Sequence, residues 1–85
     1  MVPAPTPIYY TVTINSSSSN YEDGGYSGPS LVKEHDSLTF SFNQFDFNVQ
    51  VFVGDEKRYD DETLKGQNIT IENITDHVII YFQGE

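Results

Sequence analysis

Acidic side chains are the residues of this sequence most able to do chemistry. Asp60-Asp61-Glu62 and Glu22-Asp23 could supply the oxygen ligands that calcium prefers. The Asp-x-Asp-x-Asp-Gly loop with a glutamate at its twelfth position is missing. We therefore interpret both runs as solvated charge and predict neither a metal site nor a cofactor.

The two histidines are the next candidates, for acid–base catalysis. His35 lies beside Asp36, but a nucleophile would have to come from scattered serines, and no Gly-x-Ser-x-Gly motif is present. The absence of cysteine excludes a thiol nucleophile and a thiolate zinc site. Paired carboxylates for glycoside hydrolysis are available, but so small a core leaves little room for a cleft. We expect His35 and His77 to be turn residues, and we predict no catalytic residues and no enzyme.

Aromatic and proline residues are the candidates for contact with a partner. Tyr21 and Tyr26 lie in residues 15–30, a stretch without periodicity, where they either pin a loop to a sheet or form an exposed surface. Phe52 is the one apolar residue on an otherwise polar strand face. The proline-rich start, residues 1–7, predicts a stiff, extended arm or linker. The predicted contact residues are Tyr21, Tyr26, Phe52, Tyr59, Pro3, Pro5 and Pro7.

The overall charge limits the partners. The formal net charge is -9, from 13 acidic and 4 basic residues. Direct binding to nucleic acid phosphates and to anionic membranes is disfavoured, because both need clustered Lys and Arg. The charge favours solubility, attraction of basic partners or imitation of a nucleic acid.

Alternation of apolar and polar residues predicts the elements that would position these groups. Segments with a period of two, separated by Gly, Asn and Asp turns, are typical of short strands, and no segment keeps a helical period. Residues 54–57 are predicted as a turn, and residues 58–65 are too charged for a confident element. The predicted strands are 8–14, 31–32, 37–43, 47–53, 69–72 and 78–82. The expected fold of residues 8–85 is one all-β domain, an antiparallel sandwich or partly open barrel of about six to seven short strands.

The closing segment predicts a hairpin. Ile69 and Ile71 alternate with polar residues, a turn at 72–77 holds Ile74 as an apolar plug, and a strongly apolar strand follows. The predicted core consists of Val12, Ile14, Leu38, Phe40, Phe42, Val49, Val51, Val53, Ile69, Ile71, Val78, Ile80 and Phe82.

The order of these segments resembles a known family. YTVTI at 10–14, VKEHDSLTFSF at 32–42, FNVQVFVG at 47–54, ITIENITD at 69–76 and VIIYF at 78–82 are similar to divergent internalin B-repeat modules of bacterial surfaces. Comparable Ig-like modules occur on bacteriophage virion proteins. The resemblance implies an Ig-like fold and a passive spacer, adhesin part or capsid ornament without catalytic residues. His35 stands where the family usually has glycine in a turn, and histidine tolerates the left-handed conformation better than most residues.

The sequence thus leads to one main functional hypothesis and two alternatives. The main hypothesis is a non-enzymatic structural or adhesive module, on a virion as a capsid decoration or accessory protein, or on a bacterial cell surface. Its partner would be a capsid or surface protein, including a second copy of the chain. One alternative is an acidic inhibitor that mimics nucleic acid charge against a host enzyme. The other is a carbohydrate-binding module that uses Tyr9, Tyr21, Tyr26 and Tyr59.

Overall fold

The computed structural model describes residues 6–16 and 24–84, and these form an all-β protein without a helix. Eight strands follow one another, where about six to seven were predicted. Their bounds are β1 (Tyr9–Ser16), β2 (Tyr26–Ser27), β3 (Leu31–Lys33), β4 (Leu38–Phe42), β5 (Phe47–Val53), β6 (Glu56–Thr63), β7 (Ile69–Ile71) and β8 (Val78–Gly84). The two additional strands are β2, inside the segment predicted to lack pattern, and β6.

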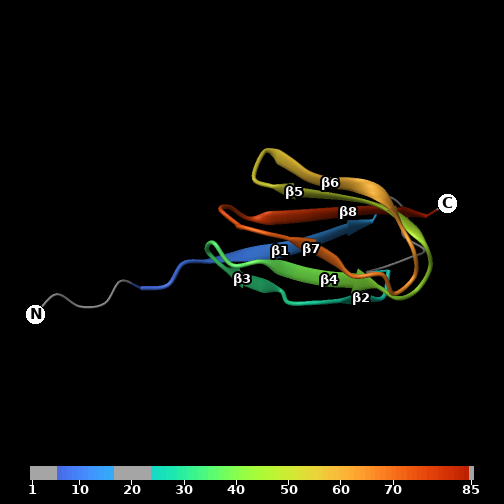
Figure 1. Cartoon of the computed structure of the whole chain (residues 1–85), viewed down its shortest axis with the longest axis horizontal. Helices are drawn as coiled ribbons and strands as arrows, with labels where there is room; N and C mark the ends of the chain where they lie inside the picture. The colour runs from blue at the N-terminus through green and yellow to red at the C-terminus, as the bar shows by residue number, and fades with distance from the viewer. Residues whose placement is uncertain (1–5, 17–23, 85) are drawn as a thin grey trace, which may run out of the picture.

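The strands form two sheets that face each other (Figure 1). The larger has five strands in the order β3-β1-β8-β5-β6, and the smaller has three in the order β2-β4-β7. The sheets are not closed into a barrel, so the sandwich-like alternative holds. The prediction of a purely antiparallel fold is wrong, because β1 and β8 pair in parallel from Val12↔Val78 to Ser16↔Phe82. No hairpin can join these two strands, since the rest of the domain lies between them in the sequence.

Strand β6 corrects the prediction of a turn and an unassigned charged segment at 54–65. It pairs antiparallel with β5 from Phe47↔Thr63 to Val53↔Glu56, with a bulge between Val51 and Phe52. It forms one edge of the larger sheet. Ladder hydrogen bonds come from the backbone, and edge strands often carry charge that prevents edge-to-edge pairing. A charged composition is therefore compatible with a strand here.

The predicted closing hairpin is also wrong, because β7 and β8 lie in different sheets. β7 pairs with β4, whereas β8 pairs with β1 and β5. Residues 72–77 carry the chain from one layer to the other. Ile74, at their centre, is 0% exposed, and its backbone is bonded to the β3–β4 turn: the His35 N–H donates to the Ile74 carbonyl (2.7 Å) and the Ile74 N–H to the Asp36 carbonyl (3.0 Å). The buried side chain and backbone bonds of Ile74 thus fix the connection that crosses from one sheet to the other.

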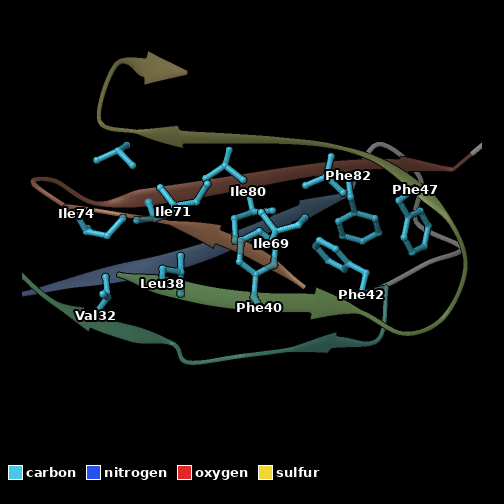
Figure 2. Packing of buried hydrophobic residues seen from close by; sticks show 14 residues of the cluster. Val32, Leu38, Phe40, Phe42, Phe47, Ile69, Ile71, Ile74, Ile80 and Phe82 are labelled. Carbon is cyan, nitrogen blue, oxygen red and sulfur yellow. The ribbon is translucent and has the colours of Figure 1, made fainter. Parts of the chain in front are cut away.

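The core lies between the two sheets, and Figure 2 shows its side chains. Eleven of the thirteen predicted core residues are buried; Val12 and Ile14 are only partly buried and pack against the core. Val32, Phe47 and Ile74 complete the core. Rings gather at the end of the sandwich where β8 finishes, with the Phe82 centroid 4.7 Å from that of Phe42 and 4.8 Å from that of Phe47.

Candidate functional site

The outer face of the five-stranded sheet carries the most distinctive exposed side chains. Side chains of paired strand residues point to the same side of a sheet, so the registers define rows across the strands. The first row holds Thr13, Ile79, Phe52 and Lys57. The second holds Asn15, Tyr81, Gln50 and Asp60, and the third holds Gln83, Asn48 and Glu62.

Tyr81 is the central residue of this face. Its side chain is 44% exposed, although it lies on β8, a strand with neighbours on both sides. The Phe52 ring packs edge-on against it, with centroids 5.7 Å apart and planes at 88°. Ile79 and Phe52, both half-buried, form the neighbouring first row, next to the second row that contains Tyr81. Tyr81 is thus an exposed aromatic ring held by an apolar neighbour.

An open groove of about 480 Å³ lies beside the Tyr81 ring. Its described lining is uncharged and mostly amide and hydroxyl: Asn15, Ser16, Asn48, Gln50, Tyr81, Phe82 and Gln83. A second hollow of about 290 Å³, which Phe52, Gly54, Asp55 and Ile79 line, touches the other side of Tyr81. The ring therefore stands between two hollows on one face.

Hydrogen bonding leaves most of the groove amides available. Gln50 Nε2 donates to Asp60 Oδ1 at 3.4 Å, and its carbonyl oxygen remains unused. Among the described residues, the side chains of Asn15, Asn48 and Gln83 have no hydrogen-bond partner. The groove thus offers several amides that can both donate and accept.

The predicted contact residues do not form one surface. Phe52 lies on the outer face described above, whereas Tyr26 belongs to the smaller sheet and Tyr59 to the edge strand β6. Pro7 is exposed and lines a hollow near the β3–β4 turn. Pro3, Pro5 and Tyr21 lie outside the described residues.

Tyr26 and Tyr59 are each half-buried and engaged within the fold. The Tyr26 ring lies 5.7 Å from Phe40 and 5.8 Å from Phe42, and its hydroxyl donates to the Pro29 carbonyl (2.8 Å). Burial raises the pKa of Tyr26 to about 12. The Tyr59 hydroxyl lies 3.2 Å from the Thr63 hydroxyl. The contacts of the Tyr26 ring with Phe40 and Phe42 fit the expectation that Tyr26 pins its segment to the sheet.

The sequence analysis did not predict Tyr81 as a contact residue. The two-residue period of residues 78–82 nevertheless places Tyr81 on the face of the strand that points away from the core. The amides that surround it belong to distant segments, β1 and β5. Only the cross-strand register brings them together, so no local spacing could indicate the groove.

His35 lies in the β3–β4 turn, as predicted, whereas His77 lies in the connection between β7 and β8, directly before β8 begins. Nδ1 of His77 accepts a hydrogen bond from the Thr11 N–H (3.2 Å), just before β8 begins to pair with β1. Its ring stacks edge-on against Tyr10, with centroids 5.4 Å apart. The Tyr10 hydroxyl donates to Glu34 Oε2 (2.8 Å), and this bond raises the pKa of Tyr10. These contacts join the first strand to the turns around it.

The carboxylates of the acidic run do not converge. Asp60 and Glu62 pair with outer-face residues of β5, and Asp61, opposite Val49, belongs to the other face. Across the part of the chain that the structure describes, no group of three or more His, Cys, Asp or Glu residues could hold a metal ion. The second run, Glu22-Asp23, lies outside the described residues. A search of residues 6–16 and 24–84 finds no helix able to cross a membrane.

Comparisons with protein-family models, with curated proteins and with solved structures find no match to this chain. The resemblance to bacterial surface repeats therefore stays a prediction.

Proposed function

We propose that this chain is a non-enzymatic, Ig-like structural or adhesive module of a virion or a bacterial cell surface, and that the outer face around Tyr81 is its contact surface. The observation that carries the proposal is the exposed Tyr81 ring, packed against Phe52 in the middle of a sheet face turned away from the core. The partner is a component of the particle or cell surface.

The position of the aromatic pair supports a binding role. Among the residues that the structure describes, fourteen buried apolar residues form the core between the sheets, and neither Phe52 nor Tyr81 is among them. Polar side chains would satisfy the outer face of a sheet equally well. Rigid tyrosines surrounded by polar groups are enriched in binding surfaces, because they give a large contact area at low entropic cost.

The β3–β4 turn supports the kinship with surface repeats. His35 has φ of 71°, the left-handed conformation that glycine adopts most easily. The resembled family usually has glycine at this position of its turn. His35 thus has the left-handed backbone conformation that a glycine at this position of the turn would adopt.

The alternative of a nucleic acid mimic has less support. It needs one continuous negative face, but the carboxylates of β6 point to both sides of the strand. In addition, Lys57 pairs with Asp60 (3.1 Å) and Arg58 pairs with Glu56. These pairs break the negative surface along the edge.

Cosedimentation with purified virions or cell walls of the source organism tests the proposal. We expect the unmodified chain to cosediment and Tyr81→Ser to lose at least ten-fold in affinity. Tyr9→Ser is the matched control, because Tyr9 is 55% exposed but lies at the opposite end of β1 from the groove. If the unmodified chain stays in the supernatant, or if both variants bind as it does, the proposed contact surface is wrong.

A further inference from the structure

We propose that the groove beside Tyr81 binds a short, uncharged oligosaccharide. This inference rests on the proposed function, since it names the ligand class of the same outer face. The site differs from the set of tyrosines that the sequence suggested for carbohydrate binding. It combines the exposed ring of Tyr81 with four amide side chains: Asn15, Asn48, Gln50 and Gln83.

The ring provides the apolar part of the site. Phe52 lies in the first row and packs against Tyr81, whereas the groove opens over the second and third rows. The neighbour thus fixes the ring on one side and leaves the groove side accessible. A pyranose presents an apolar patch of C–H groups that an aromatic surface can cover, and aromatic linings with a few placed polar groups are typical of ligand sites.

The amides provide the polar part. A sugar hydroxyl donates one hydrogen bond and accepts others, and a primary amide does the same through its NH₂ and carbonyl groups. Asn15 and Gln50 flank Tyr81 on the two adjacent strands, and Asn48 and Gln83 form the next row. Asn15, Asn48 and Gln83 have no side-chain partner among the described residues. They can therefore bond a ligand without breaking contacts in the fold.

Charge selects the class of sugar. None of the described lining residues is charged, and the nearest side chains on β6 in the same rows are Asp60 and Glu62. The whole chain has a formal net charge of -9. Sialylated, sulfated and phosphorylated ligands would be repelled, and none of the described lining residues is a cation that could compensate their charge. An uncharged ligand avoids this penalty.

The size of the groove indicates a short ligand. Its volume of about 480 Å³ falls within the range of small-molecule sites. The two amide rows lie two residues apart along the strands, roughly 6.7 Å. This space suits one or two sugar units in contact with the protein.

An array of neutral, sialylated and sulfated oligosaccharides, followed by ¹⁵N chemical-shift titration with the neutral probes that bind, tests the inference. We expect binding to neutral probes alone, with shifts at Asn15, Asn48, Gln50, Tyr81 and Gln83. Tyr81→Ser should weaken binding at least ten-fold, and Asn48→Ala should weaken it several-fold. Tyr81→Phe keeps the ring and should retain binding. Tyr9→Ser should also retain binding, because Tyr9 lies at the end of β1 that is far from the groove.

Three results would overturn the inference. The first is an array on which no neutral probe binds. The second is a preference for anionic probes. The third is self-association that both Tyr81→Ser and removal of residues 1–7 abolish, because the groove would then hold the proline-rich arm of another copy. If Tyr81→Ser abolishes attachment to particles while the array stays blank, the contact surface stands and its ligand is a protein.

Discussion

His35 and Asn73 hold two turns together: Nδ1 of His35 lies 3.0 Å from Oδ1 of Asn73. Both have positive φ, 71° and 54°, and in the described part of the chain they are the non-glycine residues that do. One belongs to the β3–β4 turn and the other to the connection between β7 and β8. Backbone bonds between His35, Asp36 and Ile74 join the same two turns.

This conformation predicts an order of stability at position 35. A residue with a Cβ atom pays roughly 1–2 kcal/mol in the left-handed region, and glycine avoids this cost. His35→Ala and His35→Gly both remove the bond to Asn73, so their difference isolates the backbone term. We expect His35→Gly to be more stable than His35→Ala by about 1 kcal/mol in urea unfolding. Equal midpoints, or a more stable alanine variant, would contradict the assigned conformation.

The crossing at residues 72–77 predicts that Ile74 behaves as a core residue despite lying in a connection. Its side chain is 0% exposed, so Ile74→Ala should cost about 2–5 kcal/mol through lost burial and a cavity. Ile74→Val should cost about 0.5–1.5 kcal/mol and keeps the test possible if the alanine variant unfolds. Thr75→Ala, at the exposed neighbouring position, is the control. If Ile74→Ala loses no more stability than Thr75→Ala, the Ile74 side chain is not packed between the two sheets.

The contact of Arg58 on β6 with the connection between β7 and β8 should contribute to stability. It is the extra residue of the β6 bulge, and its guanidinium donates to the carbonyls of Glu72 (3.0 Å) and Asn73 (3.3 Å). Arg58→Met keeps the stem and removes both bonds together with the exposed ion pair to Glu56, so we expect a loss of about 1–3 kcal/mol in chemical unfolding. Arg58→Lys, which restores the charge and one donor, should lose less. If the methionine variant is as stable as the unmodified chain, the bonds from Arg58 to Glu72 and Asn73 do not contribute to stability.

The buried phenol of Tyr26 predicts a loss of stability in alkali. Burial raises the pKa of Tyr26 from 10.0 to about 12 in the folded protein. The folded state therefore favours the protonated phenol, and this contribution is complete below pH 10 and is lost as pH rises from about 10 to about 12. We expect the free energy of unfolding to fall across this window, and to fall less in Tyr26→Phe. Tyr9→Phe is the exposed control; if it changes the pH dependence as much as Tyr26→Phe does, the assignment to Tyr26 fails.

The sequence predicted the elements with a clear local signal. β4 alternates strictly, β5 alternates except at Phe52, and β8 begins as a continuous apolar run, so the existence of these strands could be read directly from the sequence. β6 could not, because the ladder along an edge strand needs only backbone groups, and its side chains are mostly charged. The same holds for the two-residue strand β2.

Long-range relationships were beyond local pattern. A strand, a turn and a second strand have the same local sequence pattern whether the chain stays in one sheet or crosses to the other. The pattern at β7 and β8 therefore predicts a hairpin that the structure does not contain. The groove has the same origin: Asn15, Gln50 and Tyr81 meet through the parallel pairing of β1 with β8 and the antiparallel pairing of β8 with β5. Neither pairing leaves a signature in any one segment.

The parallel pairing of the first and last strands determines how a pulling force enters the molecule. The chain enters β1 at one end of the domain and leaves β8 at the other, as Figure 1 shows. Tension between the two ends therefore slides β1 and β8 in opposite directions along their shared ladder. The rungs from Val12↔Val78 to Ser16↔Phe82 are then loaded together in shear, instead of opening one after another like a zipper.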